Sequence, residues 1–115
     1  MNQQIKEKWL NALRSGEYSQ SRGCLRTTEG FCCLGVLCDL YSKETGTEWE
    51  EFKKDEALSS YSSFLEEIGT LPKEVMEWSG LKNPNPYFEN MGSLAVLNDS
   101  GTEFPKIADV IENYL

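Results

Sequence analysis

The sequence of 115 residues contains no histidine. Histidine is the commonest general base and metal ligand in proteins, and its charge ordinarily changes near neutral pH. Its absence excludes Ser–His and Cys–His nucleophile systems and most catalytic zinc sites. Enzymes built from carboxylates, lysine or tyrosine remain open, but no pair of such residues stands at a spacing typical of catalysis. We therefore expect a protein that is not an enzyme and that uses no cofactor.

Long apolar runs are also missing. No stretch approaches the ~20 apolar residues that a membrane-spanning helix needs. The first ten residues are amphipathic and polar, whereas a secretory leader is basic and then apolar. These absences predict a cytoplasmic protein without a membrane partner.

The four cysteines, Cys24, Cys32, Cys33 and Cys38, follow a spacing that does not match a zinc site. An all-cysteine zinc site requires two C-x(2–4)-C knuckles, and the spacing here is C-x7-C-C-x4-C. In a reducing compartment these thiols are expected to be free. We interpret them as small core residues that bind no metal, and structural zinc or a redox-sensitive pair are the alternatives.

Positive charge is scarce and unevenly distributed. The chain has 11 basic and 19 acidic side chains and a formal charge of -8. This balance argues against binding to polymeric nucleic acid or to an anionic membrane, because both require a basic surface. However, residues 1–43 carry a net charge of +2 and residues 44–115 carry -10, and all three arginines lie between positions 14 and 26.

The length and a hydrophobic content of 39% predict a single domain, residues 1–115, with one core. Apolar residues at helical spacing, with glycine stops and serine or threonine caps, predict helices at about 2–14, 34–44, 72–79 and 93–97 and after Thr102. A polar turn at 26–30 between 18–25 and 30–33 predicts a hairpin. Residues 49–52 are a candidate strand, residues 55–68 favour irregular structure or a frayed helix, and residues 98–101 favour a turn. The predicted class is α+β, mainly helical with a short antiparallel hairpin or small sheet.

The arginine cluster is the strongest functional signal among the residues. Guanidinium groups match phosphate oxygens in a bidentate manner, so Arg14, Arg22 and Arg26 predict an anion site. Tyr18 and Tyr41 would provide faces on which bases stack, and Gln20 would provide neutral hydrogen bonds. The prediction is a pocket for a small nucleotide. Alternatively, the arginines pair with acidic residues and the aromatic residues belong to the core.

The acidic remainder of the chain supports a competing hypothesis. A surface with ten excess negative charges can imitate DNA, so the protein would inhibit a host protein that acts on nucleic acid. Glu48, Glu50 and Glu51 are interleaved with aromatic residues, however, which is more typical of a solvated face.

The runs "FCCLGVLCDLY" and "LNDSGTEFPKIADVIE", together with "ALRSGEYSQSRGCLRTTEG" and "LPKEVMEWSGL", resemble a widespread family of small proteins encoded by tailed phages. The resemblance covers nearly the whole chain and extends to the phage immune-evasion sponges, small oligomeric proteins that sequester the cyclic dinucleotide signals of antiphage defence. It implies a homo-oligomer in the cytoplasm of the infected bacterial host that binds a cyclic dinucleotide without cleaving it. A small aromatic-rich domain is also expected to self-associate, because it buries only part of its apolar surface alone.

Overall fold

The computed structural model describes residues 1–55 and 58–115. The helices in this part of the chain are α1 (Gln3–Ser15), α2 (Cys33–Thr45), α3 (Lys73–Ser79), α4 (Leu94–Asp99) and α5 (Phe104–Tyr114). The strands are β1 (Arg26–Thr27), β2 (Gly30–Phe31), β3 (Lys53–Asp55), β4 (Leu58–Ser62), β5 (Tyr87–Phe88) and β6 (Gly92–Ser93). The predicted α+β class is confirmed.

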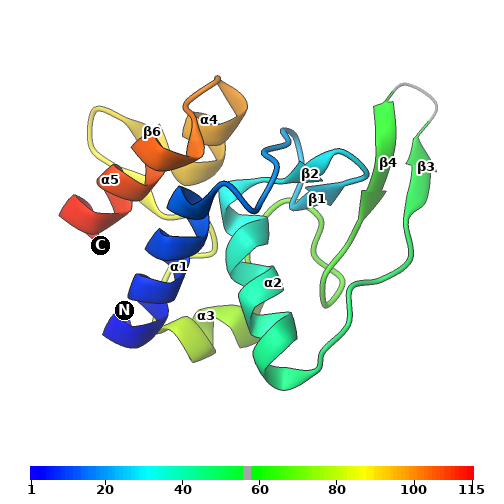
Figure 1. Ribbon diagram of the computed structural model, residues 1–115, viewed down its shortest axis with the longest axis horizontal. Coiled ribbons are helices and arrows are strands. Elements are labelled where there is room, and N and C mark those ends of the chain that lie inside the picture. The colour runs from blue at the N-terminus through cyan, green and yellow to red at the C-terminus, as the bar shows by residue number, and fades with distance from the viewer. Residues whose placement is uncertain (56–57) are drawn as a thin grey trace.

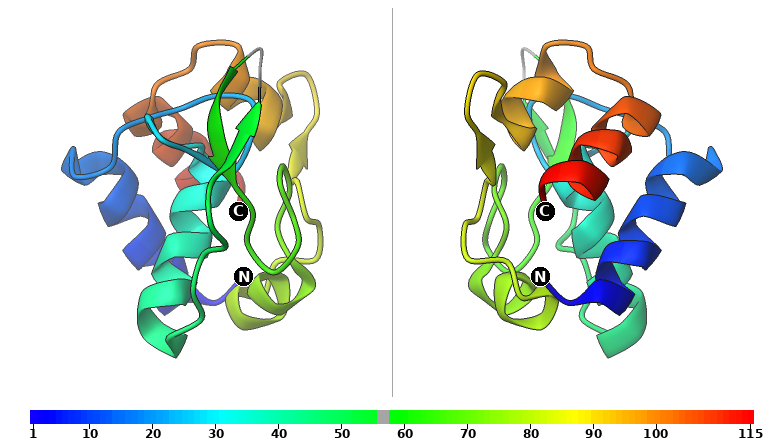
Figure 2. Two further views of the ribbon diagram at one scale, coloured as in Figure 1. Left: turned by 90° about the vertical axis from the view of Figure 1, so that its right-hand side faces the viewer. Right: turned by 90° about the vertical axis from the view of Figure 1, so that its left-hand side faces the viewer.

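Helix α2 stands between two groups of elements (Figure 1). Helices α1 and α5 lie side by side on one side of it, as the right-hand view of Figure 2 also shows, and the strands β3 and β4 lie on the other side. Within the described residues, all five helices contribute to one cluster of buried apolar side chains. No helix among these residues is both long enough and apolar enough to span a bilayer.

Helix α1 confirms the prediction from periodicity. Its apolar stripe is buried, and Trp9 at the centre of the stripe is fully covered. The indole Nε1 of Trp9 donates to the carbonyl oxygen of Cys33 at 3.0 Å, which joins α1 to the first turn of α2. The side chain of Asn2 caps the start of the helix, and Gly16 ends it with a φ of 78°.

The larger sheet is antiparallel with the order β2-β1-β4-β3. Its hairpin differs from the predicted one, because Arg26 and Thr27 form strand β1 where the sequence indicated a turn. Residues 18–25 are mostly irregular. Two backbone hydrogen bonds hold this segment along β2, from Phe31 N–H to Ser19 at 2.9 Å and from Ser21 N–H to Phe31 at 2.7 Å.

The prediction of irregular structure or a frayed helix at 55–68 is wrong where it covers β4, and residues 56–57 of that range lie outside the described residues. Strand β4 pairs with both β1 and β3, so pairing with two neighbours outweighs its serine-rich composition. Residues 49–52 form no strand.

The C-terminal third contains three differences of local detail. The turn predicted at 98–101 begins within α4, because Asn98 is helical and fully buried. Glu103, and not Thr102, occupies the N-cap position of α5. The short β5–β6 hairpin lies in a stretch for which the sequence indicated no strand.

Gly35 allows α2 to lie directly against the residue before β1. A Cβ atom at this position would overlap the carbonyl oxygen of Leu25, which also accepts a hydrogen bond from Cys32 N–H at 3.1 Å. Neither backbone can move without disturbing the start of the helix.

Substitution Gly35→Ala should therefore lower the free energy of unfolding by about 3 kcal/mol. The matched control is Gly69→Ala, because no atom lies within 4 Å of a Cβ there. The control should change stability by less than about 1 kcal/mol. Urea unfolding followed by circular dichroism measures both, and equal effects of the two changes would contradict the packing argument.

Candidate functional site

Arg26 lies among aromatic side chains beside the larger sheet. Its guanidinium carbon is 5.0 Å from the ring centroid of Phe31, 5.4 Å from that of Trp49 and 5.1 Å from that of Phe52. A cation within about 6 Å of a ring centroid is attracted by the ring quadrupole, by about 0.5–1 kcal/mol where it is exposed. We call these four residues the Arg26 platform.

The register of the β1–β2 pair brings the two central residues of this platform together. Arg26 and Phe31 are direct partners in the β1–β2 pair, so their side chains project from the same face. Trp49 and Phe52 come from the segment between α2 and β3, and the rings of Phe31 and Trp49 meet edge to face with centroids 5.8 Å apart. Arg26, Phe31 and Trp49 are half-buried, and Phe52 is 42% exposed.

The carboxylate of Asp39 in α2 holds one ring of the platform, that of Trp49, in place. It accepts hydrogen bonds from the Tyr18 hydroxyl at 2.6 Å and from Trp49 Nε1 at 3.1 Å. Lys43 Nζ lies 3.5 Å from the same carboxylate, whose side chain is only 14% exposed. Because a buried carboxylate needs such partners, these contacts fix the positions of the tyrosine and indole rings.

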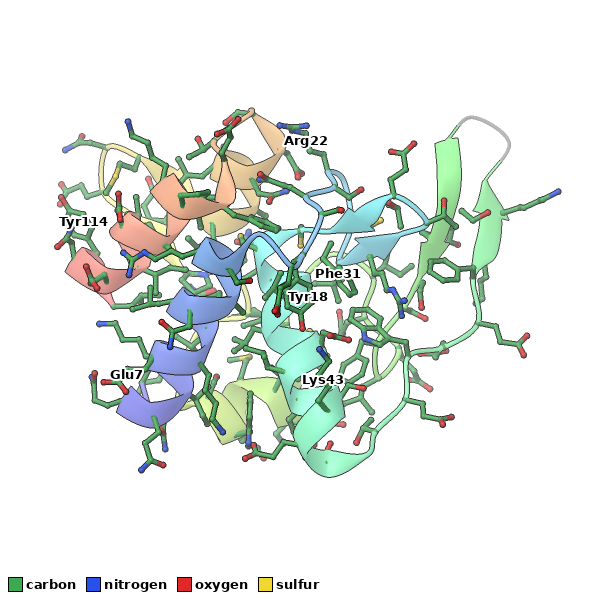
Figure 3. All side chains as sticks on the ribbon, viewed as in Figure 1. Glu7, Tyr18, Arg22, Phe31, Lys43 and Tyr114 are labelled. Carbon is green, nitrogen blue, oxygen red and sulfur yellow. The ribbon has the colours of Figure 1, made fainter. Side chains whose placement is uncertain are left out.

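Tyr18 extends the aromatic surface toward Lys43. Its ring meets Phe31 edge to face at 5.1 Å, and the Lys43 ammonium lies 5.2 Å from its centroid and 3.1 Å from its hydroxyl oxygen. Burial, and then the hydrogen bond to Asp39, raise the pKa of Tyr18. Figure 3 shows Tyr18, Phe31 and Lys43 on the same face of the molecule. A row of rings thus has a cation at each end, Arg26 and Lys43.

The arrangement has the chemistry of an anion-binding surface. The ion pairs among the described residues do not include Arg26, and its guanidinium has the planar fork of donors that matches an anion. Asp39 accepts from Tyr18 and Trp49 and pairs with Lys43, so it supports the rings and one of the cations of this surface.

Of the residues predicted from the sequence, Arg14 is engaged elsewhere. It pairs with Asp109 at 2.8 Å and with Glu112 at 3.3 Å, both on α5. The hydrogen bonds to Glu112 and Asp109 raise the pKa of Arg14. For this arginine the structure bears out the alternative of pairing with acidic residues.

Gln20 is also committed to internal contacts. Its Nε2 donates to Asn98 Oδ1 at 2.9 Å and to the carbonyl oxygen of Thr102 at 2.8 Å, and its Oε1 accepts from Phe104 N–H at 3.2 Å. Both N–H groups of its amide and the amide oxygen are therefore engaged in contacts within the protein.

Arg22 and Tyr41 lie away from the platform. Arg22 is exposed near the end of α4, where the neighbouring Gly23 N–H donates to Asp99, and in Figure 3 it does not point toward Tyr18. Tyr41 meets Trp78 at 5.3 Å, on the side of α2 that faces α3. The structure therefore brings together Tyr18 and Arg26 of the predicted set.

No motif in the sequence marks Asp39, Lys43, Trp49 or Phe52 as site residues. The i,i+4 spacing of Asp39 and Lys43 was the available signal, since it places a carboxylate and an ammonium on one helix face. No sequence pattern predicts that Trp49 and Phe52 contact Arg26. Their positions depend on the path of the segment between α2 and β3, which the sequence does not specify.

A family model described as a domain of unknown function, DUF8296, matches residues 1–115. The chain belongs to the DUF8296 family. No curated protein and no solved structure matches it.

Three of the four thiols of this DUF8296 domain are buried in the core. Cys32 is the N-cap of α2, where its Sγ accepts from Gly35 N–H at 3.4 Å, and burial raises its pKa to about 12. Burial also raises the pKa of Cys33 and of Cys38 well above the ordinary value, and Cys24 is half-buried. Within the described residues, no three cysteine or carboxylate side chains form a group that could hold a metal ion.

These environments predict selective thiol chemistry. Because the thiolate is the reactive form, Cys32, Cys33 and Cys38 should stay unmodified by iodoacetamide at pH 8 in the folded protein, and Cys24 should react first. Peptide mass spectrometry measures the order, with denatured protein as the control in which all four react. Rapid labelling of Cys32 in the folded state would contradict the burial described above.

Proposed function

We propose that this DUF8296 domain is a non-catalytic sponge that sequesters a cyclic dinucleotide or a related nucleotide signal in the cytoplasm of a phage-infected bacterium. The observation that carries the proposal is the Arg26 platform: a half-buried guanidinium that touches three aromatic rings and has no carboxylate partner among the described residues.

The platform combines the two kinds of group that a nucleotide requires. The guanidinium donates in a planar fork to phosphate oxygens. The 42% exposed ring of Phe52 offers a surface on which a base can stack, and such a contact contributes about 1–3 kcal/mol. Lys43 adds a second cation beside Tyr18, at the other end of the row. The rings are held before a ligand arrives, so little conformational entropy is lost on binding.

Two further features support binding of a small ligand without turnover. The carboxylate that contacts Trp49 of the platform, Asp39, is already occupied by donors. The net charge of -8 repels long nucleic acids but has little effect on a ligand with two phosphates that contacts two local cations. The resemblance to phage immune-evasion sponges agrees with this function.

Isothermal titration calorimetry against cyclic di- and trinucleotides and ADP-ribose-derived signals tests the proposal. We expect one of these ligands to bind with a Kd below about 10 μM, which corresponds to roughly -7 kcal/mol. Absence of any such binding would refute the proposal. Co-purification with a basic host protein in place of a nucleotide would support the acidic inhibitor instead.

Arg26→Gln should weaken binding at least about tenfold, or 1.4 kcal/mol, because it removes the charge and the bidentate donors. Arg22→Gln is the matched control, since it changes an exposed arginine away from the platform, and it should leave the Kd within about twofold. Recovery of intact nucleotide after heat denaturation is expected, and conversion to a product would show an enzyme.

A further inference from the structure

A concave surface separate from the Arg26 platform is bordered by Lys43. It is a groove of about 300 Å³ between α1, α2 and α3, lined by Lys8, Leu40, Lys43, Glu44 and Trp78. This volume is at the lower end of the range of about 300–1,000 Å³ that small-ligand sites occupy. We call it the α2 groove.

The indole of Trp78 forms a fixed wall of the groove. Its Nε1 donates to Glu44 Oε2 at 2.6 Å, and its ring meets Tyr41 edge to face at 5.3 Å and 81°. These two contacts hold the ring from different directions. Leu40 is half-buried and adds an aliphatic surface, so the groove offers a preformed apolar place for a flat ring.

The charged side chains around the groove determine whether it favours an anionic or a cationic ligand. Lys8 Nζ lies 3.8 Å from Glu44 Oε1, a long pair between side chains that are 60% and 49% exposed, so this pair holds Lys8 only weakly. Lys43 is 69% exposed and also borders the groove. Glu44 Oε2 accepts from the indole N–H, and Lys43 also pairs with Asp39, which does not line the groove. The lining therefore has two ammonium groups and one carboxylate, and this excess of positive charge favours an anion.

We propose that the α2 groove is a separate binding site for a small organic anion with one aromatic ring system. The ring lies against Trp78 and Leu40, and the anionic group contacts the ammonium groups of Lys8 and Lys43. The groove shares Lys43 with the proposed nucleotide surface, but Lys8, Leu40 and Trp78 are not part of that surface, so the inference does not rest on the proposed function.

NMR titration of the ¹⁵N-labelled wild-type protein with 1-naphthyl phosphate and with 1-naphthoate tests the site, and Trp78→Phe identifies the Trp78 indole signal. Both probes should shift that signal in a saturable way. The uncharged 1-naphthalenemethanol should bind at least about fivefold more weakly, because it lacks the anionic group.

Lys8→Gln should weaken binding of the phosphate probe at least about threefold. Lys73→Gln is the matched control, since Lys73 is an 84% exposed lysine of α3 outside the groove, and it should have no effect. Arg26→Gln should also leave this binding unchanged. No saturable shift up to about 5 mM probe, equal effects of the two lysine changes, or a shift centred on Trp49 would each overturn the proposal.

Discussion

The side-chain amide of Asn98 is fully buried and makes four hydrogen bonds, the full number that an amide can form. Its Oδ1 accepts from Gln20 Nε2 at 2.9 Å and from Cys33 N–H at 3.2 Å. Its Nδ2 donates to the carbonyl oxygen of Ser21 at 2.8 Å and to Asp99 Oδ1 at 3.1 Å. This residue joins the segment before β1, the start of α2 and the end of α4. Because a buried polar group without partners costs about 1–3 kcal/mol, these segments must keep their relative positions.

Helix α2 links the hydrogen bonds of Asn98 to the two candidate binding surfaces. Its start is fixed by Asn98, and its later turns bear two carboxylates that each accept an indole N–H, Asp39 from Trp49 and Glu44 from Trp78. The Arg26 platform and the α2 groove are thus built from one helix by the same kind of contact. Lys43 borders both, because it lies within reach of Tyr18 on one side and lines the groove on the other. The segment that Asn98 holds then leads into β1 and sets the position of Arg26.

Helices α1, α2 and α3 were predictable because each buries apolar residues, such as the stripe around Trp9, and ends at a glycine. Strand β4 was not, since its serines carry no apolar alternation and its partner β1 is distant in sequence. Residues 98–101 have the composition of a turn, and Asn98 departs from it because its amide is buried. The site was predicted in part: Tyr18 and Arg26 lie in one row of rings, but Arg14 is drawn to α5. Arg14 and Arg26 are close in the sequence, but the contacts of Arg14 with α5 are long-range and cannot be predicted from that closeness.

The backbone hydrogen bonds around β2 and β3 also limit how copies of this chain can associate. One edge of the larger sheet, along β2, is covered by the backbone of Ser19 and Ser21. The other edge, β3, carries the exposed lysines Lys53 and Lys54. A covered edge and a charged edge both discourage the addition of a further strand. Self-association of this domain would accordingly proceed through side-chain surfaces, and joining two sheets into one is disfavoured.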